Sequence, residues 1–222
     1  MTAYGNRVRL VWWSILVLAI AGLNYGSRFA SSSSTDTHDT VYSWSSFFGG
    51  IVIYAVWLGL VFAIAVDRRE LLAMRQPDSW QRALGYCVGA IVTIFAVSGI
   101  VAALPLPQTP SQEQGLTPTH WEPKHAAAFA ANVFLFAVVA PFVEELMFRG
   151  LGQSLLRFLG RVPSIVLVGV SFGVSHGLVE GLLVLIPFGI VLAVVRDRTD
   201  SVYPGMLVHG LFNGTALALS VL

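Results

Sequence analysis

Charged residues and cysteine are scarce in this sequence of 222 residues. Asp, Glu, Lys and Arg make up 11% of it and hydrophobic types 55%, which is too apolar for an ordinary soluble domain. The mean hydropathy of +0.73 indicates a membrane protein. The single cysteine, Cys87, excludes an internal disulfide and a cysteine-rich metal site. The formal net charge of +1 gives no reason to expect a nucleic-acid partner.

Seven apolar segments predict an all-α fold, a polytopic transmembrane bundle of about seven helices. A span needs about 20 apolar residues, and the second, third, fourth and seventh segments are long enough. The fifth and sixth are short, so six or eight spans remain possible. We expect one domain, with N-terminal spans in residues 1–110 and a motif-bearing catalytic core in residues 126–217. The segments are Val8–Tyr25, Phe47–Val66, Ala83–Leu104, Ala126–Phe148, Pro163–Leu178, Gly181–Val195 and Val202–Val221.

Basic residues fall mainly on one side of this seven-segment arrangement. With a cytoplasmic N-terminus, the outer side holds only Arg28 and Lys124. This bias predicts a multi-pass protein of the cell membrane whose N-terminus is cytoplasmic. The inner side holds Arg7, Arg9, Arg68, Arg69, Arg75, Arg82, Arg149, Arg157, Arg161, Arg196 and Arg198.

The first segment has an alternative interpretation as a cleaved signal peptide. Arg7 and Arg9 precede an apolar stretch, and Ala19-Ile20-Ala21 resembles a cleavage site. We favour an uncleaved span, because apolar residues continue to Leu23 and the charge bias holds with the span retained.

The fourth segment carries the pattern Glu144-Glu145-x-x-x-Arg149 in otherwise apolar sequence. Charges inside a bilayer persist mainly where they pair, face a cavity or take part in chemistry. One helix is predicted over residues 126–159, with Pro141 freeing the carbonyl of Ala137 and kinking the helix. Glu145 and Arg149 are i,i+4 neighbours, whereas Glu144 is rotated by about 100°. We therefore expect Glu145 to pair with Arg149, and Glu144 to face a cavity as a general base.

Two further patterns, Phe172-x-x-x-His176 and His209-x-x-x-Asn213, each place two side chains on one helix face. Phe172 is expected to pack against the site. His176 lies about 20 Å along its helix from the start of the fifth segment, deeper than Glu144 and His209. The three meet only if the fourth helix dips inward, or if the fifth is strongly tilted or begins outside the lipid. The long fourth helix is expected to allow this.

Glycines repeat at four-residue spacing beside His176. Gly169, Gly173 and Gly177 form a small-residue row that lets a neighbouring helix approach closely. We expect Gly85 and Gly89 to play a similar packing role in the third segment. Glu180 follows the row and is expected to be an outer-loop acid.

The three motifs, in this order on successive apolar helices, resemble those of the CPBP family. These are the CAAX-prenyl-protease-like and bacteriocin-processing (Abi) intramembrane proteases. Each motif alone is weakly specific, whereas three in order are much more so. The resemblance covers roughly residues 126–217 and implies hydrolysis of a peptide bond in a membrane protein or lipidated peptide. A chain this small is expected to be prokaryotic, so farnesylated CAAX substrates are not expected.

Two mechanisms fit these residues. In one, Glu144, His176 and His209 hold a catalytic zinc with an open position for water. In the other there is no cofactor: Glu144 and His176 activate water, while His209 and Asn213 donate to the oxyanion. An amide is a poor zinc ligand and a suitable oxyanion donor, so Asn213 favours the metal-free version. Glu145 and Arg149 give structural support in both.

Two other classes of function remain open. Membrane carboxylates and histidines also form proton relays, so an ion-coupled transporter is one alternative. The two halves of the chain lack corresponding broken segments, which argues against it. The other is a non-proteolytic membrane scaffold or bacteriocin-immunity factor, which should tolerate the substitution Glu144→Gln.

Overall fold

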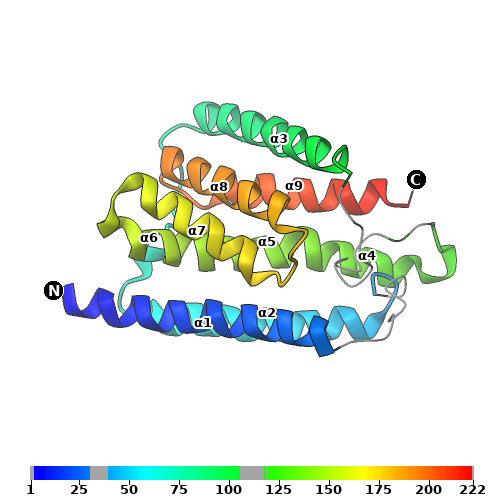
Figure 1. Ribbon diagram of the computed structural model, residues 1–222, viewed down its shortest axis with the longest axis horizontal. Helices are drawn as coiled ribbons and strands as arrows, with labels where there is room; N and C mark the ends of the chain where they lie inside the picture. The colour runs from blue at the N-terminus through cyan, green and yellow to red at the C-terminus, as the bar shows by residue number, and fades with distance from the viewer. Residues whose placement is uncertain (1–2, 31–39, 106–117, 119, 222) are drawn as a thin grey trace.

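The protein folds as a bundle of helices, which confirms the all-α membrane architecture (Figure 1). The computed structural model describes residues 3–30, 40–105, 118 and 120–221. Serine side chains cap two of the helices, because Ser43 and Ser79 accept hydrogen bonds from backbone N–H groups in the first turns of α2 and α3. The main elements are α1 (Ala3–Ala30), α2 (Trp44–Ile64), the short η2 (Arg69–Leu72), α3 (Trp80–Ala102), one helix over Pro123–Leu159, α7 (Arg161–Ser175), α8 (Leu182–Thr199) and α9 (Tyr203–Leu219).

Four of the described helices are long and apolar enough to cross a membrane: Gly5–Phe29, Trp44–Ile64, Trp80–Ala102 and Pro123–Leu159. The first is longer than the segment expected from sequence. The seventh segment was expected to be long enough to cross the membrane, and this expectation is wrong. Its helix, α9, has 17 residues and is not among the four long apolar helices. Its helix starts at Tyr203, where Pro204 fits the first turn, and ends at Leu219. The fifth segment is short, as expected, since α7 has 15 residues.

The helix Pro123–Leu159 runs through the acidic motif, as predicted, and changes its register twice on the way. Two π-helical stretches flank the α-helical turn that carries the two glutamates. Such widened turns occur often at functional sites. The successive pieces are η4 (Pro123–His125), α4 (Ala126–Phe134), the π-helix η5 (Leu135–Val139), α5 (Ala140–Glu145), the π-helix η6 (Leu146–Gly152), α6 (Gln153–Leu156) and η7 (Arg157–Leu159).

The π register changes which carbonyl Pro141 leaves free. The N–H of Ala140 bonds to the carbonyl of Leu135, five residues earlier. In the same register the next donor would be Pro141, which has no N–H for the carbonyl of Phe136. The acceptor that the proline frees is therefore Phe136, one residue before the Ala137 expected from α-helical geometry.

Glycine allows α7 and α8 to pack at close range. A Cβ at Gly169 would lie 2.7 Å from the backbone nitrogen of Ile190, and one at Gly173 would lie 3.1 Å from that of Ile186. Gly177 has a φ of +68° and faces α1 instead. The packing role expected for Gly85 and Gly89 is wrong: a Cβ at either would meet nothing within 4 Å, because that face of α3 is unpacked.

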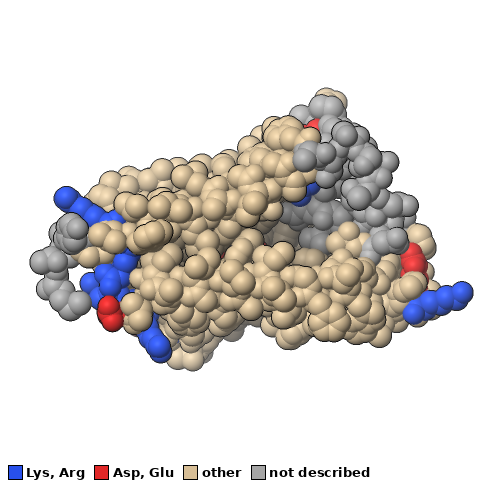
Figure 2. All heavy atoms as spheres, turned by 90° about the horizontal axis from the view of Figure 1, so that it is seen from below, with Lys and Arg blue, Asp and Glu red and all other residues tan. Residues whose placement is uncertain are grey.

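Basic side chains gather at the end of the bundle where the N-terminus lies, here called the basic end (Figures 1 and 2). Arg157 and Arg161, at the turn between α6 and α7, both pair there with Asp197. One residue counted with this group does not belong to it. Arg149 is 0% exposed and paired within the bundle, so ten basic residues remain at this end. The excess of basic residues at one end of the bundle therefore remains.

Reporter fusions can determine the orientation of the bundle. Because basic loops remain in the cytoplasm, fusions after Arg75 and Arg161 should score as cytoplasmic. Fusions near Thr37 and Gln114, which lie outside the described residues, should score as external. A cytoplasmic result at Thr37 would reverse the orientation, and an external result at Arg161 would contradict the order of the helices.

Candidate active site

A cavity of about 960 Å³ lies between α1, α2, α5, α7, α8 and α9. Most of the side chains around it are apolar. Glu180, expected to be an outer-loop acid, lines it together with Arg28 from the last turn of α1. The polar side chains among the described lining residues are Asn24, Arg28, Thr40, Tyr54, Glu144, Ser175, His176, Glu180, His209 and Asn213.

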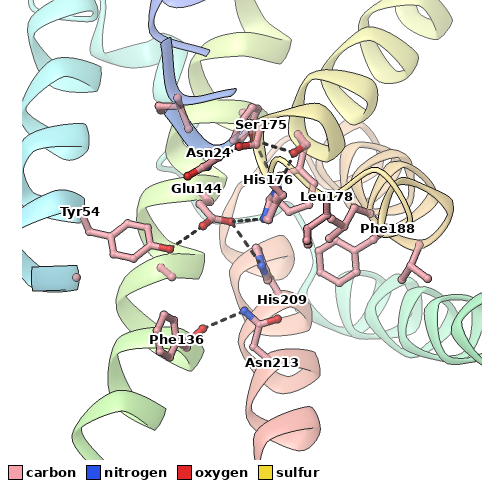
Figure 3. A pocket seen from close by; sticks show the side chains of 18 of the residues that line it. Asn24, Tyr54, Phe136, Glu144, Ser175, His176, Leu178, Phe188, His209 and Asn213 are labelled. Carbon is pink, nitrogen blue, oxygen red and sulfur yellow. Dashed lines mark hydrogen bonds and ion pairs between the residues drawn. The ribbon is translucent and has the colours of Figure 1, made fainter. Parts of the chain in front are cut away.

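Glu144 stands at the centre of the polar groups in this cavity (Figure 3). One of its oxygens, Oε1, accepts a hydrogen bond of 3.0 Å from the hydroxyl of Tyr54 on α2. The other, Oε2, lies 4.0 Å from Nε2 of His176 and 3.8 Å from Nε2 of His209. The structure thus brings together three candidate residues that are far apart in sequence. Glu144 is 7% exposed and lines the cavity, so its carboxylate reaches the cavity from a largely buried helical turn.

Glu145 points away from the cavity into the core, as its rotation on the helix predicts. Its Oε1 accepts from Nη1 of Arg149 at 2.8 Å, and both side chains are 0% exposed. Arg149 also donates to the carbonyl of Gly189 at 3.0 Å and lies 4.3 Å from the centre of the Phe172 ring. The carboxylate, the carbonyl and the aromatic face compensate the buried charge in part, while Nε of Arg149 has no hydrogen-bond partner among the described residues.

Both histidines present Nε2 to Glu144 because a partner engages the opposite ring nitrogen. Nδ1 of His176 lies 2.7 Å from the carbonyl of Phe172, which can only accept, so Nδ1 is the donor. Nδ1 of His209 lies 3.1 Å from Oε1 of Glu145 and donates in the same way. The ring of Phe172 packs against both imidazoles, with centroid distances of 4.5 and 5.7 Å. Each ring is therefore fixed in orientation, and Figure 3 shows both rings directed towards Glu144.

Asn213 follows His209 by one turn and also lines the cavity. Its Nδ2 donates a hydrogen bond of 2.9 Å to the carbonyl of Phe136, the acceptor freed by Pro141. One N–H of the amide is thus engaged and the second is available. The helices approach closely here, since a Cβ at Gly210 would lie 2.5 Å from the carbonyl oxygen of Ala137.

Glu144 and His176 lie at the same depth because they are equally far from the turn that joins their helices. Glu144 precedes Leu159 by 15 positions, and His176 follows Arg161 by 15 positions. At 1.5 Å per residue, both lie about 22 Å from the turn. The fourth segment was expected to end at Phe148, and that boundary placed Glu144 too near the inner face of the membrane. The extension to Leu159 resolves the difference in depth between Glu144 and His176.

This arrangement falls within a region that matches a known protein family. The model described as type II CAAX prenyl endopeptidase Rce1-like matches residues 126–215. This part of the chain is therefore similar to the Rce1-like CAAX endopeptidases. The family supports a proteolytic function, and together with the four long apolar helices it supports an integral membrane protein. Neither the curated proteins nor the solved structures contain a match to this chain.

Two residues outside the Rce1-like region also contact the site, and the sequence reasoning missed both. Tyr54 bonds to Glu144, and Asn24 donates a hydrogen bond of 2.7 Å to the carbonyl of Ser175, the last residue of α7 before His176. The available signal was weak. A lone tyrosine or asparagine in an apolar span needs a partner for its polar group, but sequence does not show which partner.

The site of the Rce1-like region fits zinc in its chemistry, and its donor atoms lie a few tenths of an ångström farther apart than a tetrahedral ion would hold them. A carboxylate and two imidazoles form a common ligand set. Two ligand atoms at about 2.1 Å from a tetrahedral ion lie about 3.4 Å apart, whereas Oε2 of Glu144 lies 3.8 and 4.0 Å from the two nitrogens. Among the described residues, no group of three or more His, Cys, Asp and Glu side chains has the placement that a metal ion requires.

Proposed function

We propose that the protein is an intramembrane endopeptidase that hydrolyses a peptide bond of a membrane-associated protein or peptide with water activated by Glu144 and His176. The observation that carries this proposal is the approach of Oε2 of Glu144 to both histidine Nε2 atoms inside an apolar cavity. The similarity of residues 126–215 to a family of endopeptidases supports the same reaction class.

A single water fits between Glu144 and His176. A water that donates one hydrogen bond of about 2.8 Å to each of two acceptors holds them about 4.4 Å apart. Oε2 of Glu144 and Nε2 of His176 are 4.0 Å apart, and Nε2 carries a lone pair because Nδ1 donates to Phe172. A water held by both hydrogens directs its oxygen lone pairs at the scissile carbonyl carbon.

His209 is suited to the opposite role, as a donor to the oxyanion. Its Nδ1 donates to the Glu145 carboxylate, so in the protonated ring Nε2 also carries an N–H, on the side of Glu144. With His209 protonated, two carboxylates balance Arg149 and the imidazolium, so the buried group carries no net charge. The second N–H of Asn213 supplies the other donor.

The protons balance over the reaction. Glu144 takes a proton from the water while the oxygen of the water bonds to the carbonyl carbon. The carbonyl oxygen then becomes the oxyanion, which lies between His209 and Asn213. The intermediate collapses when the carbon–nitrogen bond breaks and Glu144 returns the proton to the leaving amine. The products are a new carboxylic acid, which then gives its proton to the new amine or to solvent, and a new amine, with the enzyme regenerated.

The test is a peptidase assay of the detergent-purified protein against a library of membrane peptides in water enriched in oxygen-18. Each cut should leave a product whose new carboxyl group contains oxygen from the solvent, detected by mass spectrometry. The Glu144→Gln variant is the control for contaminating proteases. Release of peptides at equal rates by both proteins, or no release by either, would contradict the proposal.

Substituting Tyr54 with phenylalanine should lower turnover by about ten- to hundredfold. The hydroxyl holds one oxygen of Glu144, which leaves the other to face the histidines, and a hydrogen bond to a charged group contributes about 1.5–3 kcal/mol. The turnover number should fall while the yield of folded protein stays the same. Tyr86→Phe is the matched control, because Tyr86 is exposed on α3 and lies outside this cavity. Equal turnover for the two variants would contradict a role for Tyr54.

A further inference from the structure

His176 stands in the sharp turn that ends α7. It directly follows Ser175, the last residue of the helix, and the next residue, Gly177, has a φ of +68°. The N–H groups of His176 and Gly177 each bond to a carbonyl three residues earlier, at 3.2 Å. The position of the His176 imidazole therefore depends on how the end of α7 is held.

The same turn supplies the acceptor that orients the ring. The carbonyl of Phe172 accepts hydrogen bonds from the hydroxyl of Ser175 and from Nδ1 of His176, each at 2.7 Å. If the last turn of α7 opened, Nδ1 would lose this acceptor. Nε2 would then no longer be directed towards Glu144.

Asn24 of α1 holds this turn from outside the α7–α8 hairpin. In the part of the chain that the structure describes, no backbone N–H bonds to the carbonyl of Ser175, and Nδ2 of Asn24 donates to it at 2.7 Å (Figure 3). A Cβ at Gly177 would lie 2.8 Å from the carbonyl carbon of Asn24, so the two backbones touch. Asn24 therefore contacts the residues on both sides of His176. Without its amide, the last carbonyl of α7 would lose its partner in apolar surroundings.

The rest of α1 is packed firmly enough to serve as a support. Trp13, Val17, Ile20 and Asn24 follow one another at intervals of three or four residues, so they share one face of the helix. The first three are at most 6% exposed. Nε1 of Trp13 also donates a hydrogen bond of 2.9 Å to the carbonyl of Met147. The face that presents Asn24 to α7 is thus fixed against the bundle.

Resting on the proposed endopeptidase function, we infer that Asn24 is a positioning residue of the active site, which acts by fixing the end of α7 and so the place of His176. Nε2 of His176 lies 4.0 Å from Oε2 of Glu144, a separation that suits one shared water. A displacement of about 1 Å can slow a reaction by about 10²-fold. Asn24 lies outside residues 126–215, so the first helix completes a site whose other parts lie largely in the Rce1-like region.

Substitutions at Asn24 test this role in the purified full chain. Asn24→Leu keeps the size and lacks the amide, so turnover per folded molecule should fall by about ten- to hundredfold with little change in the Michaelis constant. Asn24→Gln keeps an amide donor, and the cavity beside position 24 has room for one more methylene, so it should retain more turnover. Equal losses in the two variants would overturn the inference, because the donor would then not matter.

Trp13→Phe is the matched control, because it removes a hydrogen bond from the same helix to another backbone carbonyl. It should lower the unfolding temperature and leave turnover per folded molecule unchanged. A loss of turnover as large as that of Asn24→Leu would mean that any loosening of α1 has this effect, and the specific role of Asn24 would be wrong.

Hydrogen exchange followed by mass spectrometry tests the same contact without requiring catalysis. Asn24→Leu should speed exchange of the backbone N–H groups of His176 and Gly177, and Trp13→Phe should not. Unchanged exchange in Asn24→Leu would overturn the inference. If exchange quickens but the parent protein cleaves no peptide, the endopeptidase function is wrong and the support of α7 by Asn24 stands. If the parent cleaves peptides and Asn24→Leu does so equally fast, the function stands and the positioning role is wrong.

Discussion

Replacing Glu144 with glutamine is expected to lower the turnover number by at least about 10²–10⁴-fold, the usual contribution of a general base. Glutamine has nearly the same shape, and its carbonyl oxygen can still accept the hydrogen bond from Tyr54. It cannot take a proton from water or return one to the leaving amine. Because Glu144 borders the cavity, the loss of its charge should leave insertion, yield and thermal unfolding unchanged. The measurement is peptide hydrolysis at equal amounts of folded protein.

Glu145→Gln provides the matched comparison at the adjacent position. This carboxylate bonds to Arg149 and to Nδ1 of His209, and none of the three residues is more than 3% exposed. An amide there leaves the guanidinium without a counter-charge, which costs about 3–5 kcal/mol for a buried pair. We expect a lower yield and a lower unfolding temperature, with turnover lost as His209 loses its anionic partner. Equal yield and equal residual activity for the two variants would show that the roles of the two acids are not divided.

The sequence was sufficient to predict features that depend on local geometry. Spacing along one helix predicted the pair of Glu145 with Arg149 and the different direction of Glu144. The row of small residues at Gly169 and Gly173 predicted a close helix contact. Apolar length identified the helices, but it placed their ends only approximately. In the fourth span, that error put Glu144 at the wrong depth.

Contacts between distant helices could not be predicted from the sequence. Tyr54 and Glu144 are 90 residues apart, and Glu145 and His209 are 64 residues apart, so both contacts depend on how the helices pack. The π-helical register around Pro141 could not be predicted from the sequence either, because proline is compatible with both the α and the π register. It decides that the carbonyl of Phe136, rather than that of Ala137, is left without an N–H from Pro141.

Replacing Asn213 with alanine is expected to lower turnover by about 10²–10³-fold, the usual cost of one oxyanion donor. The Michaelis constant should change little, because the bond to the oxyanion forms chiefly in the transition state. If Asn213 had only a structural role, the Asn213→Ala variant would behave differently. The amide also joins α9 to η5 through Phe136, so loss of that contact alone would lower stability and leave turnover per folded molecule unchanged.

Asn132 provides a control for the structural effect of losing a buried amide. Its Nδ2 donates to the carbonyls of Val41, Ser43 and Ala128, and the side chain does not line the cavity. Asn132→Ala should therefore lower the unfolding temperature without changing turnover per folded molecule. If the two alanine variants differ only in stability, Asn213 does not donate to the oxyanion.

Chelation separates this mechanism from a zinc mechanism at the same residues. If Glu144 and His176 hold the water directly and Asn213 donates to the oxyanion, activity should survive exhaustive chelation and metal analysis should find no stoichiometric zinc. A zinc enzyme would lose activity on chelation and recover it with added zinc, while Asn213→Ala stayed active, because an ion would then stabilise the oxyanion. That outcome would make Glu144, His176 and His209 ligands. It would require their side chains to move closer together than the 3.8 and 4.0 Å separations in this structure.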